Sequence, residues 1–107
     1  MTVKSLAEKL GARVVCMPSP KRECSGVYIG DLLSWVMGKA EADNVWITIM
    51  SNINIAAVAT LADLSCILLA EGVIPERDVI DVALSKGINI LSTDLSAYDA
   101  AVRIAGL

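Results

Sequence analysis

Polar side chains follow four short apolar runs of the chain, at the point where each run ends. Asp31 follows residues 27–29, Ser51, Asn52 and Asn54 follow 45–50, Glu71 follows 65–70, and Thr93 and Asp94 follow 88–91. If these runs are parallel strands, their carboxyl ends meet at one edge of a sheet, beside the free N–H groups of helix N-termini. Hydroxyl, amide and carboxylate groups gathered there would bind a phosphate or another polar metabolite.

Helix capping is the alternative explanation for these residues, because Ser, Thr, Asn and Asp are the preferred N-caps. The corner at 51–54 is the least well explained by capping, since three polar side chains crowd one turn of an otherwise apolar segment. We therefore expect ligand contacts from this corner, with further contacts from the strand end opposite. The expected contacts are Ser51, Asn52, Asn54, Thr93, Asp94 and Asp31.

The same strand ends carry carboxylates, which leaves a small metal-dependent enzyme using Asp31, Glu71 or Asp94 as an alternative. The chain contains no histidine, which excludes His-based zinc sites and Ser-His triads. Neither a P-loop nor a Gly-x-Gly-x-x-Gly fingerprint occurs. No self-sufficient catalytic signature remains, so the sequence predicts a non-enzymatic protein that needs no cofactor and no metal.

Strands and helices are predicted to alternate along the whole chain. The expected strands are 13–16, 27–29, 45–50, 65–70 and 88–91, and the expected helices are 2–10, 32–37, 53–63, 75–86 and 96–105. Such alternation indicates βαβ crossovers, and continuous apolar strands indicate a sheet that is covered on both faces. We expect one three-layer α/β domain over residues 1–107, with a mainly parallel sheet and helices on both faces.

Helix ends are marked by capping residues, prolines and glycines. The predicted N-caps are Thr2, Asp31 and either Ser51 or Asn52; Pro75 is placed in a first turn, and Gly11, Gly38 and Gly87 are expected to end helices. The last helix carries Tyr98, Ala101, Val102 and Ala105 on one face. Trp35 and Trp46 are expected to anchor the core or an interface.

The helix at 53–63 is apolar almost all round, so it is expected to be buried on every side. One side would pack on the sheet, and the other needs a neighbouring helix or a partner subunit. The chain as a whole is 55% hydrophobic, which is high for a small domain with much surface. Both observations favour a homo-oligomer, most simply a homodimer.

The net charge of −3 argues against a nucleic-acid binder and against binding to an anionic membrane. Charged residues interrupt 2–10, so no signal peptide is expected, and polar residues break the apolar run at 45–71 before it could span a bilayer. The three cysteines do not form a disulfide framework: Cys66 should be buried, whereas Cys16 and Cys24 flank a loop and could approach each other. A soluble cytoplasmic protein is therefore expected.

The segment 21–37 (KRECSGVYIGDLLSWVM) resembles the DRTGG domain family, small α/β modules similar to the N-terminal domain of HPr kinase/phosphorylase. Matching positions are Arg22, Ser25, Gly26, Asp31, Leu32 and Leu33, whereas Lys21 and Val27 depart from the pattern. Residues 48–54 and 90–94 also resemble stand-alone members of the family.

The resemblance implies a regulatory or interaction module without catalytic activity. It makes Arg22 and Ser25 the expected polar contacts if the loop senses a ligand, although a solvated loop is the simpler explanation. We expect a module that binds a small anionic ligand, such as a nucleotide, or a protein partner, and that acts as a homo-oligomer. The alternative outside the enzyme class is a scaffold or accessory subunit of a larger enzyme, with no small ligand.

Overall fold

Five strands form a single sheet in the computed structural model, which describes residues 1–107. The strands are β1 (Arg13–Cys16), β2 (Val27–Ile29), β3 (Val45–Thr48), β4 (Cys66–Leu69) and β5 (Ile90–Ser92), arranged in the order β1-β5-β4-β3-β2. β2 to β5 are parallel, and β1 pairs with β5 in the antiparallel direction. The carboxyl ends of four strands therefore lie at one edge of the sheet, as the sequence predicts.

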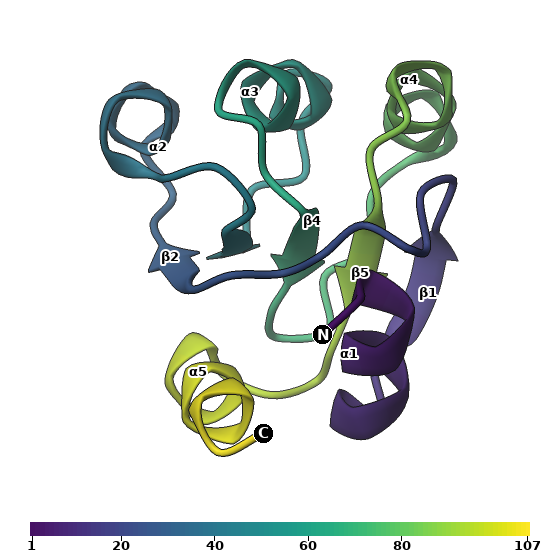
Figure 1. The fold of residues 1–107 in the computed structure, drawn as a ribbon. Helices are drawn as coiled ribbons and strands as arrows, with labels where there is room; N and C mark the ends of the chain where they lie inside the picture. Colours follow the sequence, from purple (N-terminus) through teal and green to yellow (C-terminus); the bar gives the residue numbers. More distant parts are fainter.

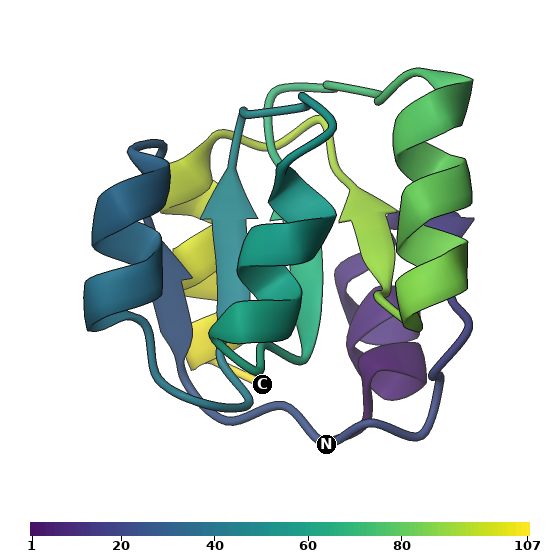
Figure 2. The same cartoon turned by 90° about the horizontal axis from the view of Figure 1, so that it is seen from above.

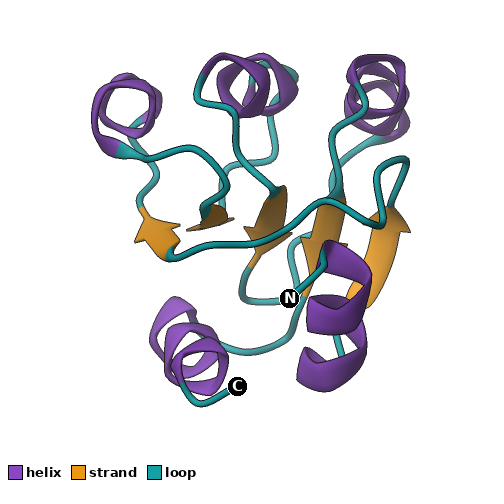
Figure 3. Ribbon diagram, in the orientation of Figure 1, coloured by secondary structure: helices purple, strands orange, loops and turns teal.

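Helices cover both faces of this sheet (Figure 1). The helices are α1 (Val3–Leu10), α2 (Leu33–Lys39), α3 (Ile55–Leu61), α4 (Arg77–Lys86) and α5 (Ala97–Ala105). α2, α3 and α4 lie side by side over one face, and α1 and α5 lie under the other (Figures 2 and 3). The predicted three-layer α/β domain with a mainly parallel sheet is thus confirmed. None of the five helices combines the length and the apolar character that a membrane crossing requires.

The core consists of two apolar layers, one on each side of the sheet. Every residue of β3 and β4 is buried, which explains why these runs carry no alternating polar positions. Trp46 is fully buried and its indole Nε1 donates a hydrogen bond to the carbonyl of Gly30, 2.8 Å away. Trp46 is therefore a core anchor, and Cys66 is buried as expected.

Two helix starts differ from the prediction. Asp31 does not cap α2: the N-cap is Leu32, without a side-chain hydrogen bond, because the Asp31 carboxylate is bound to β3 instead. Neither Ser51 nor Asn52 caps α3, whose N-cap is Asn54, because residues 49–54 form a loop before the helix begins. Gly38 lies inside α2 rather than at its end.

The remaining helix ends follow the prediction more closely. Thr2 caps α1 through its side chain, and Gly11 and Gly87 end their helices in the left-handed conformation. Pro75 precedes α4, whose N-cap is Glu76, so its placement inside the first turn is wrong by two residues.

α3 is not buried on every side, contrary to the expectation from its composition. Ile55, Ala56, Val58 and Ala59 face the core, but the side chain of Leu61 is 75% exposed. α3 lies between α2 and α4, which cover its flanks (Figure 2). Its apolar character is therefore largely explained by neighbours within the same chain.

Candidate functional site

Six of the expected ligand residues lie at the carboxyl edge of the sheet, because each follows a parallel strand. They are Asp31, Ser51, Asn52, Asn54, Thr93 and Asp94. Two of them, Ser51 and Asn52, line a polar groove of about 390 Å³ between the β3–α3 loop and the start of α4. We call this the corner groove; its other lining residues are Ile53, Glu76, Asp78 and Val79.

The 51–54 corner keeps part of its polarity free. The side-chain carbonyl of Asn52 accepts a hydrogen bond from the backbone N–H of Asn54 at 2.9 Å, which shapes the turn. Asn54 occupies the N-cap position of α3, yet its side chain makes no capping hydrogen bond. Capping thus does not account for the corner: the Asn52 carbonyl shapes the turn, and the Asn54 side chain does not cap the helix.

Two carboxylates from α4 complete the corner groove, and sequence reasoning missed both. Glu76 is the N-cap residue of α4, and Asp78 lies in its first turn, where a carboxylate oxygen accepts a hydrogen bond from the N–H of Val79. Their negative charge favours hydroxyl, amino or cationic groups over a bare phosphate. The acidic residues after Pro75 are typical of a helix start, but nothing in the sequence indicates that they lie beside Ser51.

Asp31 ties the end of β2 to the end of β3. Its carboxylate accepts hydrogen bonds from the Thr48 hydroxyl at 2.7 Å and from the N–H of Ile49 at 3.1 Å. The Thr48 oxygen in turn accepts from the N–H of Met50 at 3.1 Å. Asp31 therefore holds the chain that leads into the corner.

Thr93 and Asp94 follow β5, and β4 lies between that strand and β3. The Thr93 hydroxyl accepts a hydrogen bond from the N–H of Leu95 at 3.2 Å. Asp94 accepts a hydrogen bond from the guanidinium of Arg13 at 2.8 Å, and this contact lowers the pKa of the Asp94 carboxyl. Neither residue lines the corner groove, so the structure does not bring the two halves of the expected site into one cavity.

The carboxylates that raised the enzyme alternative are also kept apart. No group of three His, Cys, Asp or Glu side chains lies close enough to hold a metal ion. Asp31 is bound to Thr48 and Asp94 to Arg13, so each has a different partner within the chain.

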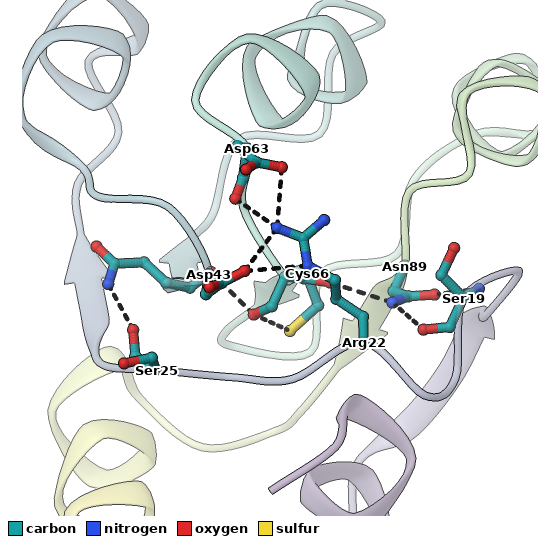
Figure 4. Close-up of polar contacts among 9 residues, drawn as sticks. Ser19, Arg22, Ser25, Asp43, Asp63, Cys66 and Asn89 are labelled. Atoms are coloured by element: carbon teal, nitrogen blue, oxygen red, sulfur yellow. Dashed lines mark hydrogen bonds and ion pairs between the residues drawn. The ribbon is translucent and has the colours of Figure 1, made fainter.

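Arg22 and Ser25 lie at the opposite edge of the sheet, where β2, β3 and β4 begin. The Arg22 guanidinium donates to the Asp43 carboxylate at 2.7 and 3.1 Å, to the Asp63 carboxylate at 2.9 Å and to the Asp63 carbonyl at 2.8 Å (Figure 4). The hydrogen bonds to Asp43 are the main reason that the pKa of Arg22 is raised. These four contacts, made by Nε and one of the two terminal nitrogens, hold Arg22 against both aspartates.

The rest of the 17–26 segment is fastened along the same edge (Figures 2 and 4). The Asn89 side chain accepts from the N–H of Ser19 at 2.9 Å and donates to the Ser19 carbonyl at 2.8 Å. The Asn44 amide donates to the carbonyl of Ser25 at 2.7 Å. Gly26 has a φ of +76°, and an added Cβ would lie 2.9 Å from the Asn44 amide nitrogen. Glycine is therefore required at the point where the segment turns into β2.

All three cysteines are free, and the thiol that neighbours Cys24 is that of Cys66. The Cys66 thiol lowers the pKa of Cys24 to about 7, and the pKa of Cys66 rises well above its usual value. Burial raises the pKa of Cys16. Cys24 is therefore the one thiol with substantial thiolate character at neutral pH.

Comparison with known protein families matches residues 5–107 to the DRTGG domain. The chain belongs to the DRTGG domain family. The match spans nearly the whole chain, which confirms the resemblance that segments 21–37, 48–54 and 90–94 indicated. In this DRTGG domain, the matching residues Arg22, Ser25 and Gly26 serve to fasten the segment to the strand starts.

A comparison with functionally curated proteins gives no match. Among solved structures, the fold is similar to the CBS and DRTGG domains of the regulatory region of Clostridium perfringens pyrophosphatase, crystallised with its activator diadenosine tetraphosphate. The TM-score is 0.75 at 15% sequence identity, over 96% of this chain and 45% of the other. This DRTGG domain thus spans less than half of that structure, and the likeness concerns the fold.

Replacing Arg22 with alanine should destabilise the domain by about 1–3 kcal/mol, because Asp43 and Asp63 lose a shared charged donor. Each kcal/mol should lower the Tm by about 4–8 °C in a thermal melt. The matched control is Arg77→Ala, which breaks only an exposed i,i+4 pair with Asp81 and should cost about 0.5 kcal/mol or less. Equal losses from the two variants would contradict the structural role of Arg22.

The Asp94 carboxyl should titrate below its ordinary pKa of about 3.9 in a pH series followed by NMR. Its pKa is lower folded than unfolded, so the folded chain binds fewer protons there. The stability from this pair is present above about pH 4 and is lost as the pH falls through the folded-state pKa. Arg13→Gln should return the Asp94 pKa toward 3.9 or so; an unchanged titration would show that the ion pair does not form in solution.

Iodoacetamide at pH 7 should alkylate Cys24 before Cys16 and Cys66 in the folded protein, as read by peptide mass spectrometry. Cys66→Ala removes the donor and should cut the thiolate fraction of Cys24 about tenfold, as its pKa returns toward about 8.5. Cys66→Ser keeps a donor and should slow the reaction less. Equal labelling rates in the two variants would rule out the hydrogen bond as the cause.

Proposed function

We propose that this chain is a non-enzymatic regulatory module that binds a small nucleotide-class anion in the corner groove and acts as a homo-oligomer in the cytoplasm. The observation that carries the proposal is the polar groove at the carboxyl edge of the sheet, which Ser51 and Asn52 line together with Glu76 and Asp78. Parallel sheets bind ligands at this edge. Membership of the DRTGG family supports a regulatory role.

The size and chemistry of the corner groove support a nucleotide. Its volume of about 390 Å³ lies within the range of about 300–1,000 Å³ that is typical of small-molecule sites. The carboxylates of Glu76 and Asp78 would accept hydrogen bonds from ribose hydroxyls or base amino groups, and Ser51 and Asn52 would add neutral donors. The structural neighbour from Clostridium perfringens was crystallised with a dinucleotide activator, which suggests which ligands to test first.

The negative charge of the corner groove determines how the phosphates of a nucleotide would bind. With two carboxylates on the wall, a free polyphosphate would be repelled, so a divalent cation should accompany it. Arg77 stands between these two acids in the sequence, and its largely exposed guanidinium is the nearest basic group along the chain. We therefore propose that the nucleotide binds as its magnesium complex.

Thermal unfolding at fixed protein concentration tests the proposal, with diadenosine tetraphosphate, ATP and AMP added with and without Mg²⁺. A ligand at about 100 times its Kd should add about 2.7 kcal/mol to the stability. Ser51→Ala should reduce the shift in Tm, whereas Ser85→Ala, at the other end of α4, should leave it unchanged.

Glu76→Gln separates two binding modes. If magnesium bridges the phosphates to the acids, the variant should weaken the shift; if the anion binds alone, the variant should strengthen it. No shift with any nucleotide would contradict the proposal and favour an accessory subunit that has no small ligand.

A further inference from the structure

We infer that the free edge of β2 is the contact between two copies of this chain, which pair their β2 strands antiparallel about a two-fold axis. The inference deepens the homo-oligomeric part of the proposed function and rests on it. It makes the five-stranded sheet one half of a continuous ten-stranded sheet. The supporting observations are the character of the two sheet edges, the direction of the β2 backbone groups and the apolar surface on both sides of this strand.

The two edges of the sheet are protected to different degrees. β1, at one edge, begins with the charged Arg13, has an irregular register between Val14 and Cys16, and is followed by Pro18. β2, at the other edge, is Val27-Tyr28-Ile29, with no charge, proline or bulge. Charges, prolines, bulges and short length are the devices that keep edge strands from pairing with other chains. β2 is short, with three residues, but it lacks the other three devices, so its outward backbone groups are open to a further strand.

The backbone of β2 presents matching groups outward. The Gly26 carbonyl accepts from the N–H of Val45, and the N–H of Gly30 donates to the carbonyl of Ile47. Since successive residues of a strand alternate in direction, Tyr28 also faces β3, and the N–H and C=O groups of Val27 and Ile29 point away from the sheet. A two-fold axis at Tyr28 would pair Val27 with Ile29 of the partner subunit, which gives four hydrogen bonds.

Apolar side chains flank this edge on both faces of the sheet. Under β2 runs an apolar groove of about 690 Å³, which we call the edge groove, between the strand and α5. Its walls are residues 26–29 on one side and Ala101, Ile104 and Ala105 on the other. By helical spacing, Tyr98 lies on the same flank of α5 as Ala101 and Ala105, and its side chain is 75% exposed.

The other face adds two more large side chains. Leu32 is exposed just before α2, and Trp35 in its first turn is 56% exposed; this helix lies over β2, opposite α5 (Figures 1 and 3). With β2 paired, α2 would meet α2 of the second copy on one face, and α5 would meet α5 on the other. The small Ala101 and Ala105 would let the α5 helices approach closely.

A stable dimer buries about 800 Å² on each partner, and the exposed apolar side chains beside β2 would form the centre of such an interface. Trp35 and Tyr98 are aromatic residues, which bury about 150–250 Å² each, and more than half of each is exposed. Ile29 and Leu32, together with the lining of the edge groove, add aliphatic surface between them. A second copy of the chain presents the same groups in the reverse direction, as an isologous interface requires.

Light scattering after size exclusion, from micromolar to several hundred micromolar protein, tests the interface. The wild type should be a dimer, and Ile29→Lys should weaken dimerisation by about a hundredfold or more, because it places a charge at the centre of the contact. Ile29→Pro should act similarly, since it removes only an outward N–H. The matched control is Val14→Lys, on the opposite edge at the same 50% exposure, which should remain a dimer.

A thermal melt of each variant shows that it is folded. A wild type that stays monomeric at the highest concentration, or a Val14→Lys variant that dissociates as readily as Ile29→Lys, would overturn the inference. Nucleotide-induced shifts in Tm, measured on the same samples, report on the corner groove separately. A monomer whose Tm still shifts with nucleotide would therefore contradict the β2 interface but not ligand binding.

Discussion

The fork of hydrogen bonds from Arg22 connects three parts of the chain that no other charged group links. Asp43 and Asp63 lie just before β3 and β4, and both have positive φ values, 67° and 56°. A non-glycine residue in this conformation is strained, and it persists where its surroundings fix it. Here the N–H of Asp43 donates to the carbonyl of Asp63 at 2.8 Å, and the Arg22 guanidinium binds both carboxylates.

This arrangement matters because the two central strands have no polar side chain of their own to fix their starts. β3 and β4 are buried along their whole length. Hydrophobic burial, which has no direction, therefore holds them in the core without fixing the position of each residue along the strand. The ties at their amino ends fix that position. Two further hydrogen bonds at this edge, from Asn44 to Ser25 and from Asn89, just before β5, to Ser19, fasten segment 17–26 itself. The first part of the segment that resembles the family, around Arg22 and Ser25, therefore fastens the starts of these strands.

The sequence predicted most of the fold because its signals were local. Short, mostly apolar runs predicted the strands, and glycines with positive φ ended α1 and α4 as expected. What failed depended on partners far apart along the chain. Asp31 looked like a helix cap until the Thr48 hydroxyl, seventeen residues away, proved to be its partner. The ion pairs of Arg22 could not be foreseen either, because its acids lie 21 and 41 residues further on.

The candidate site shows the same limit. Ser51 and Asn52 were readable from the sequence because capping explained them poorly, but the order of the strands separates them from Thr93 and Asp94. Glu76 and Asp78 join them instead, through a helix that packs beside α3. This exchange changes the chemistry of the site, since hydroxyls and amides alone would suit an anion, whereas two added carboxylates favour a ligand that also brings donors or a cation.

A regulatory module also needs a physical link between the place where a ligand binds and the surface that transmits its effect. Asp31 supplies such a link, since its carboxylate follows β2 and accepts from Thr48 and Ile49, just before the corner at 51–54. Movement of the 51–54 corner would thus be transmitted to the end of β2. Coupling of this kind is reciprocal: a ligand that strengthens pairing of β2 must bind more tightly to the paired form, by the same factor. The hydrogen bonds of Asp31 connect the corner to β2, which makes such coupling physically feasible. The magnitude of the coupling is set by the difference in the ligand's affinity for the paired and unpaired forms.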